Sequence, residues 1–264
     1  MKIEVYQARW MMILSLLAMM SVTAASQGEM EIRSRMYSWE EGVSSQRQWG
    51  MITSIMQGTS RDFRKIEVSG IILHGGKQFT EIHESSDEIL LLVIEGSILL
   101  ETDDDSEIMS PGSAALLMPG TDFMIENTNS DDGRFFLIAY SSRSEVDLSR
   151  GLNEGGSQLF AWSSLSFHKH DKGGLRRYFN RPTAMSKRFE MHTTTLDPGL
   201  KSHEPHTHRA AEIILMIAGK TEEQIGEDFY QGSVGDFYFL ESEIPHAIQN
   251  IGSEPALYYA FQFE

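Results

Sequence analysis

Three histidines and one glutamate occur at spacings that could bring them to one metal ion. His206 and His208 are two residues apart, Glu212 follows His208, and His246 comes after two further turns. Side chains at positions i and i+2 of a strand project from the same face, so both imidazoles of the pair can reach one point. Three neutral imidazoles and one carboxylate suit a divalent transition ion, and we expect Mn, Fe, Zn, Ni or Cu.

The segments around these residues have the pattern of short buried strands. The apolar runs at 89–94 and 213–217 are too short for helices, and a glycine follows two residues after the end of each. Flanking turn residues favour a buried strand for such a run. Residues 64–140 show no helical periodicity, and the same texture resumes at Arg188. The sequence therefore predicts an all-β fold.

An internal repeat relates the two halves of the chain. Gly96, Gly112 and Asn127 each lie 123 residues before a residue of the same type, namely Gly219, Gly235 and Asn250. One ungapped shift aligns these landmarks over about sixty residues, which is the signature of a repeated structural unit. We infer two copies of one β unit.

The second copy resembles the cupin superfamily, and the doubling resembles a bicupin. Gly199, His206, His208, Glu212 and Gly219 match the first cupin motif with one extra residue before the histidine pair; Gly235, His246 and Asn250 match the second motif. Glu241 and Glu243 replace the Pro and Gly of the second motif, which leaves its turn uncertain. The resemblance implies two jelly-roll barrels in tandem, with His206, His208, Glu212 and His246 as metal ligands. By itself a histidine cluster also suits a solvated turn, and His203 is expected at the surface.

The first copy has lost this pattern. The 123-residue shift places His83, Ser85, Ile89 and Phe123 at the four ligand positions. Only the histidine suits a transition ion, although a one-residue bulge could bring Asp87 or Glu88 into the site. We therefore expect a metal-free first barrel that serves as a scaffold or as part of a dimer interface.

Two strands next to the motifs supply candidates for substrate contact. Their side chains share one face of each strand, but the sequence does not decide whether that face lines the pocket or meets solvent. The candidates are Arg188, Glu190, His192, Tyr258 and Gln262. No catalytic residue is assigned from the sequence.

The ends and the middle of the chain complete the expected organisation. Residues 1–25 combine Lys2 and Arg9 with an apolar run and small residues, which is typical of a signal peptide and predicts a soluble periplasmic or secreted protein. We expect an N-terminal extension at 26–62, the first barrel at 63–141, a linker at 142–186 and the second barrel at 187–264.

Composition excludes several classes of function. The formal net charge of −16 and the lack of a basic patch argue against nucleic-acid binding, and after signal removal no segment would bind a membrane. The absence of cysteine excludes disulfides, thiolate metal sites and cysteine nucleophiles. Exposed barrel edges make a homodimer a reasonable expectation.

Three functions remain open. The first is a metal-dependent enzyme acting on a small polar, oxygen-rich substrate, either a carboxylate or derived from a sugar. Cupins include dioxygenases, decarboxylases, isomerases and hydrolases, so the resemblance does not choose the reaction. The second is a non-catalytic bicupin in which the ion or ligand stabilises the barrel. The third is a hydrolase like ureidoglycine aminohydrolase, whose metal motif has Glu and Gln where this sequence has His.

Overall fold

The computed structural model describes residues 30–79 and 86–264, and most of their regular structure is β-strand. The predicted signal peptide lies outside the described residues. Residues 31–264 form one compact unit. Among the described residues, no helix is long and apolar enough to cross a membrane.

The first barrel consists of a seven-stranded sheet and a four-stranded sheet. The strand order is β12-β9-β6-β11-β4-β3-β2 in the large sheet and β5-β10-β7-β8 in the small one. The strands are β2 (Val43–Gln46), β3 (Gly50–Gly58), β4 (Phe63–Leu73), β5 (Gln78–Phe79), β6 (Glu88–Glu95), β7 (Ile98–Thr102), β8 (Ser106–Met109), β9 (Ala114–Leu117), β10 (Phe123–Glu126), β11 (Gly133–Ser142) and β12 (Gln158–Phe160).

The second barrel repeats this plan with a seven-stranded and a three-stranded sheet. The orders are β1-β19-β16-β21-β15-β14-β13 and β18-β17-β20. The strands are β1 (Arg35–Tyr37), β13 (His168–His170), β14 (Gly173–Arg181), β15 (Phe189–Leu196), β16 (Ala211–Ala218), β17 (Thr221–Ile225), β18 (Asp228–Gly232), β19 (Phe237–Leu240), β20 (His246–Asn250) and β21 (Ala256–Phe263). The prediction of an all-β fold with two tandem jelly-roll barrels is confirmed.

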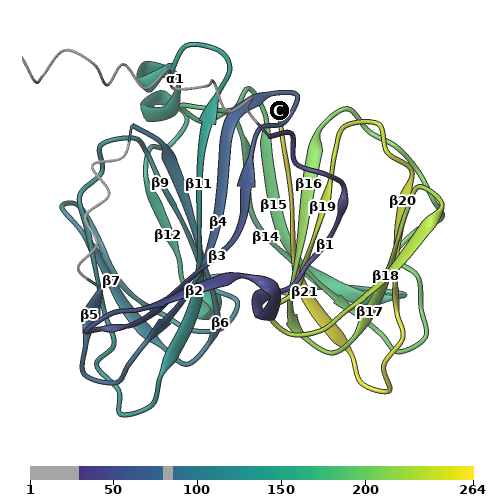
Figure 1. Cartoon of the computed structure of the whole chain (residues 1–264), viewed down its shortest axis with the longest axis horizontal. Helices are drawn as coiled ribbons and strands as arrows, with labels where there is room; N and C mark the ends of the chain where they lie inside the picture. The colour runs from purple at the N-terminus through teal and green to yellow at the C-terminus, as the bar shows by residue number, and fades with distance from the viewer. Residues whose placement is uncertain (1–29, 80–85) are drawn as a thin grey trace, which may run out of the picture. The chain divides into compact units, whose positions relative to one another are not determined.

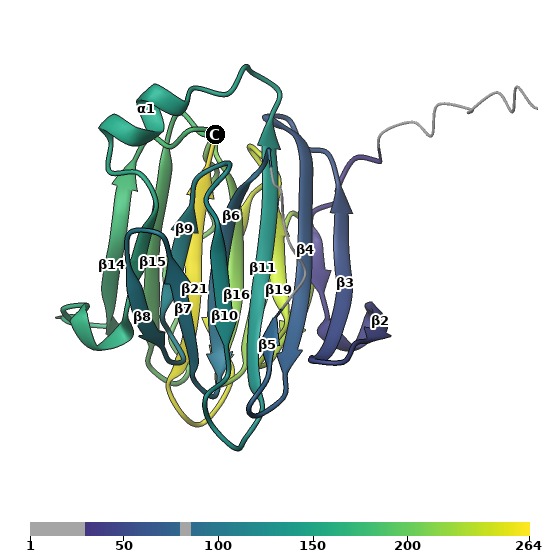
Figure 2. The ribbon, with the colours of Figure 1, turned by 90° about the vertical axis from the view of Figure 1, so that its left-hand side faces the viewer.

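Within residues 30–79 and 86–264, helical structure is limited to three short segments. The 3-10 turns are η1 (Trp39–Glu41) and η2 (Trp162–Ser164), and the single α-helix of the described residues is α1 (Leu148–Asn153). The α-helix lies at one end of the strands, near the C-terminus (Figure 2).

The two large sheets face each other, and the small sheets lie on the outside (Figure 1). This arrangement explains the apolar runs, because both faces of β6 and β16 are covered. On β16, Ile214 and Met216 point into the second barrel, whereas Ile213 and Leu215 point toward the first barrel. Strands buried on both faces lose the alternation of a half-exposed strand.

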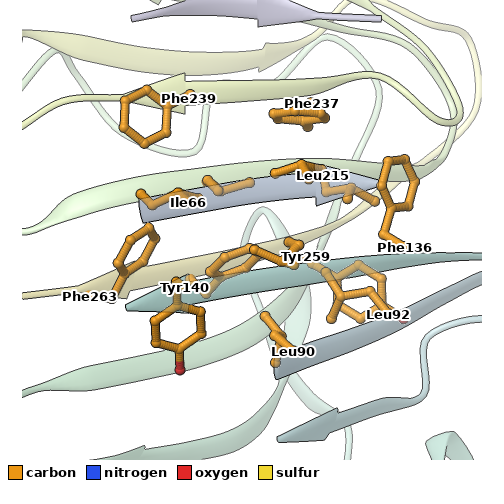
Figure 3. Packing of buried hydrophobic residues seen from close by; sticks show 14 of the residues in the cluster. Ile66, Leu90, Leu92, Phe136, Tyr140, Leu215, Phe237, Phe239, Tyr259 and Phe263 are labelled. Carbon is orange, nitrogen blue, oxygen red and sulfur yellow. The ribbon is translucent and has the colours of Figure 1, made fainter. Parts of the chain in front are cut away.

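One hydrophobic cluster joins the barrels. It contains Leu90, Leu92 and Phe136 of the first barrel and Leu215, Phe237 and Tyr259 of the second (Figure 3). The Tyr259 hydroxyl lies 2.8 Å from the carbonyl oxygens of both Val93 and Ser113, so it can donate to either across the interface. Burial of these large side chains makes the two barrels one cooperative core.

The barrels also exchange short strands. β1 pairs with β19 of the second barrel, and β12 pairs with β9 of the first. Both strands obey the 123-residue shift, as do β3 and β14. The segments set apart from the sequence as an extension and a linker therefore carry strands of both barrels. Three-residue edge strands have no local apolar pattern, which is why the sequence analysis missed β1 and β12.

Candidate metal centre

The loop before β16 carries two histidines to the open end of the second barrel. The sequence analysis placed His206 and His208 on a strand, but both lie in this loop. An isolated bridge joins His206 to His246: the N–H of each donates to the carbonyl of the other, at 3.2 and 3.0 Å. His208 accepts at its carbonyl from the Glu243 N–H at 2.8 Å. The loop is thus fixed to the strand that supplies the third histidine.

The four predicted ligands lie together. Nitrogen atoms of His206, His208 and His246 all lie within 4.8 Å of one another. Oε2 of Glu212 lies 3.0 Å from Nε2 of His208 and 3.3 Å from Nε2 of His246. This is the only group of at least three such ligands that the structure brings together in residues 30–79 and 86–264.

Backbone carbonyls select the tautomers of two of these imidazoles. Nδ1 of His208 lies 2.8 Å from the oxygen of Ala210, and Nδ1 of His246 lies 2.9 Å from the oxygen of Ile244. A carbonyl only accepts, so each Nδ1 carries the proton and each Nε2 keeps its lone pair. Nε2 of His246 is buried and has no hydrogen-bond partner. Bonds of this kind orient metal-binding histidines, so the residues fit a divalent ion.

The electrostatics of the cluster favour an ionised carboxylate. Burial acts to raise the pKa of Glu212, but interactions with His208 and His246 outweigh it and lower that pKa to about 2. The bond to Glu212 raises the pKa of His208. Burial and the neighbouring histidines lower the pKa of His206. The carboxylate of Glu212 and the neutral imidazole of His206 are forms that bind a cation, whereas His208 must release its proton to do so.

The register of the strands shows which face of β15 and β21 points into the barrel, a question that the sequence did not decide. Glu190, Gln262 and Glu212 are direct neighbours on β15, β21 and β16. One step deeper, His192 aligns with Ala260 and Ile214 of the second-barrel core. Glu190, His192 and Gln262 thus share the interior face with Glu212.

The predicted contact residues differ in depth. Nε2 of Gln262 lies 3.2 Å from Nε2 of His208, directly beside the ligands. Arg188 lies near the open end, where its guanidinium donates to Glu190 at 2.6 Å. Burial lowers the pKa of His192. Tyr258 is 2% exposed and belongs to the core below the site.

One residue next to the cluster was misjudged from the sequence. His203 was expected at the surface, but it is half-buried, and its ring packs edge-on against His206 with 4.1 Å between centroids. The signal was available in the density of histidines between 203 and 208. The cupin motif spacing does not include His203. The fold of the loop brings it to the cluster, because Lys201 and His206 both form bridges with β20.

The first barrel offers no comparable site among its described residues. Ile89 is buried in its interior. His83 and Ser85 lie outside the described residues. Glu88 points to the other face of β6, where it accepts from the Tyr140 hydroxyl at 2.8 Å and from Thr183. The alternative that a bulge brings Glu88 into the barrel is therefore wrong.

Comparison with known families now identifies the domain. Residues 192–261 match the family model described as "Cupin domain". The second barrel is a cupin domain. No curated protein matches the sequence.

Solved structures extend the similarity to both barrels. Lactobacillus farciminis oxalate decarboxylase in complex with formate has a TM-score of 0.65 at 15% identity, covering 88% of this chain and 86% of that one. Protein Ylba of E. coli has a TM-score of 0.69 at 16% identity, covering 90% and 95%. Bacillus subtilis oxalate decarboxylase, studied for its Mn(II) centers, has a TM-score of 0.66 at 13% identity, covering 89% and 78%. The chain has the bicupin fold.

The cupin turn before the third histidine is retained despite its changed residues. Glu243, at the position of the motif glycine, is the only non-glycine with positive φ among the described residues, at 64°. This left-handed conformation is unfavourable for a side chain with Cβ. The turn is held by the Glu243–His208 backbone bond and by the Ile244 N–H, which donates to the Glu241 carbonyl at 3.3 Å.

Proposed function

We propose that this bicupin is a metal-dependent enzyme that acts on a small, oxygen-rich substrate in its second barrel. The supporting observation is the convergence of His206, His208 and His246 on Glu212, with the Nδ1 atoms of His208 and His246 held by backbone carbonyls so that their Nε2 atoms face the carboxylate. Four protein ligands leave open positions on a divalent ion, which would polarise chelating substrate oxygens as a Lewis acid.

Cationic side chains support an anionic substrate. Arg188 donates to Glu190 beside the ligands, Arg177 is the cross-strand partner of His192, and Lys172 donates to the carbonyl of Ser202, next to His203. These cations stand beside the carboxylates of Glu190 and Glu212 in a chain whose net charge is −16. Local positive potential attracts carboxylates to a site even when the protein as a whole is acidic. We therefore favour a carboxylate or a sugar acid.

The polar wall beside the ligands would orient such a substrate. Gln262 and Glu190 lie on the interior face next to Glu212, and Arg188 stands at their outer end. Arg188 would bind a carboxylate through its guanidinium, and Gln262 would donate its amide to a second oxygen. The buried apolar residues below, Ile214 and Met216, would limit the depth of the ligand.

The decisive measurement is the metal content of protein purified without added metal, followed by turnover of a panel of oxo-, hydroxy- and sugar carboxylates. We expect one ion per chain, and loss of ion and turnover in His208→Ala and His246→Ala. His74→Ala is the control, because His74 lies in the first barrel and its side chain is only partly buried. If no ion binds after metal loading, the site assignment fails. If the ion binds but His208→Ala only lowers the melting temperature, the non-catalytic alternative holds.

We also propose that the chain is exported. The support is the leader pattern of residues 1–25. The intact mass of protein recovered from the periplasm or medium should correspond to a chain that starts near residue 26. Full-length protein found only in the cytosol would refute export.

A further inference from the structure

Glu223 is a buried carboxyl group that has no ion pair among the described residues and only the N–H of Ala247 as a nearby polar group. It lies on β17 and is 0% exposed. Among the described residues, neither Oε1 nor Oε2 finds a hydrogen-bond partner of acceptable geometry. Buried polar groups in native proteins are nearly always satisfied, so an orphaned carboxyl calls for a partner.

Strand register places this carboxyl beside the candidate metal centre. On β17, the buried residues Thr221, Glu223 and Ile225 alternate with partly exposed ones and face the interior. Ile225 is the cross-strand partner of His246, and Glu223 is the partner of Ile248. Glu223 therefore lies one inward position deeper than His246, at a diagonal separation that long side chains span.

Burial without an ion pair among the described residues disfavours the ionised form of Glu223. Burial raises its pKa well above the usual range, and the charge of Glu212 raises it further, with only partial relief from the Ala247 N–H. The neighbouring apolar side chains, Ile225, Ile248 and Tyr258, belong to one core cluster. An unpaired ion in such a place is far more costly than a neutral acid.

The position carries a cost in stability that an apolar side chain would remove. A leucine or methionine would extend the cluster of Ile225 and Ile248, whereas the carboxyl must be desolvated with only the Ala247 N–H to offset the cost. A polar group kept in an apolar core at such a cost is typical of a functional site. The neutral acid presents an O–H that needs an acceptor.

We propose that Glu223 is a binding residue of the second barrel, which donates a hydrogen bond to an acceptor oxygen of the ligand while other ligand oxygens face the metal ion. This inference rests on the proposed function and deepens it. An O–H donor below the ion favours oxygens that only accept, those of carboxylate or oxo groups. A ligand that presents only amines at this depth would leave the O–H unpaired. The ligand class is accordingly a carboxylate or oxo acid.

Two variants separate this role from a structural one. Glu223→Gln keeps a donor and the shape of the side chain, and Glu223→Met keeps the length but removes the polar atoms. The experiment measures metal stoichiometry, melting temperature, and binding of oxalate, pyruvate and glycolate by calorimetry to the metal-loaded proteins.

We expect the wild type to bind at least one of these carboxylates. Glu223→Met should melt at a higher temperature, keep one ion per chain, and bind the carboxylate roughly 10- to 100-fold more weakly, as for loss of one bond to a charged group. Glu223→Gln should stay within a few-fold of the wild type. Unchanged affinity in Glu223→Met overturns the proposal, and so does a lower melting temperature of that variant.

An infrared readout makes the test independent of the metal. In the infrared difference spectrum between metal-free wild type and Glu223→Gln at neutral pH, the carbonyl stretch of a protonated carboxyl should be present. Its absence from this difference spectrum overturns the proposal for Glu223 while leaving the metal site intact. Failure of the wild type to bind metal overturns the proposed function instead, and failure to bind any of the carboxylates with the ion in place overturns the ligand class.

Discussion

Two buried asparagines, one in each barrel, allow a matched test of how the fold supports the site. Asn250 donates from Nδ2 to the carbonyls of Leu196 at 2.7 Å and Glu254 at 2.9 Å, and its Oδ1 accepts from the Gly252 N–H at 2.8 Å. Asn127 makes the equivalent three bonds, at 2.9, 2.8 and 3.0 Å. Both residues are 0% exposed.

Replacement by alanine should destabilise the protein by the same amount at either position. Each hydrogen bond contributes about 1 kcal/mol, so three bonds give roughly 3 kcal/mol for either variant. For a protein of this size the melting temperature should fall by about 6–12 °C. Denaturant titration and calorimetry of Asn250→Ala and Asn127→Ala would measure both quantities.

The two variants should differ in metal affinity. Asn250 ends the strand that begins with His246, so its loss loosens the backbone of a ligand, whereas Asn127 lies in the barrel without a described metal site. We expect metal binding to weaken about tenfold in Asn250→Ala, as for outer groups that orient a ligand, and to stay unchanged in Asn127→Ala. Equal weakening in both variants, or a stability loss under about 1 kcal/mol in either, would refute the reasoning.

Three further expectations follow from the fold and the charges. Glu243→Gly should raise the melting temperature by about 2 °C, because relief of left-handed strain of about 1–2 kcal/mol exceeds the entropy that glycine adds to the unfolded chain; a lower melting temperature would contradict the strain at φ 64°. In metal-free protein, burial raises the pKa of Glu223 in the folded state above its unfolded-state pKa of 4.5. The neutral carboxyl therefore makes its full contribution to stability below pH 4.5, and this contribution is lost as the pH rises toward the folded-state pKa. Glu223→Gln should thus show a smaller decline in stability above pH 4.5 than the wild type. Residues 187–264 expressed alone should not fold, because they lack β1, β13 and β14 of the second barrel's large sheet; a cooperative unfolding transition of this fragment would show that the exchanged strands are dispensable.

Local patterns carried most of the fold prediction. The runs at 89–94 and 213–217 could be interpreted as buried strands because cores on both sides demand apolar residues at every position. Left-handed turns require glycine, so Gly96 and Gly219, with φ of 70° and 81°, recur at the same step of each copy. The same reasoning failed at Glu243, where hydrogen bonds hold the turn without glycine.

The candidate site was only partly accessible to the same reasoning. His206, His208, Glu212 and His246 could be grouped because their spacing follows from one loop, one strand and one returning strand. For His203 the sequence offered only the density of histidines between 203 and 208, since its approach to His206 depends on how the loop pairs with β20.

The sequence by itself determined that the chain is a doubled β unit with one histidine-rich site, because turn glycines, strand alternation and ligand spacing are local properties. Only the tertiary structure decided that β1 and β12 are exchanged, that Glu190 and Gln262 face the interior, and that Glu223 is buried beside His246. Those features depend on which strands pair and in which register, and a slip of one residue would turn every side chain to the other face. Register is fixed by the packing of residues far apart in the chain.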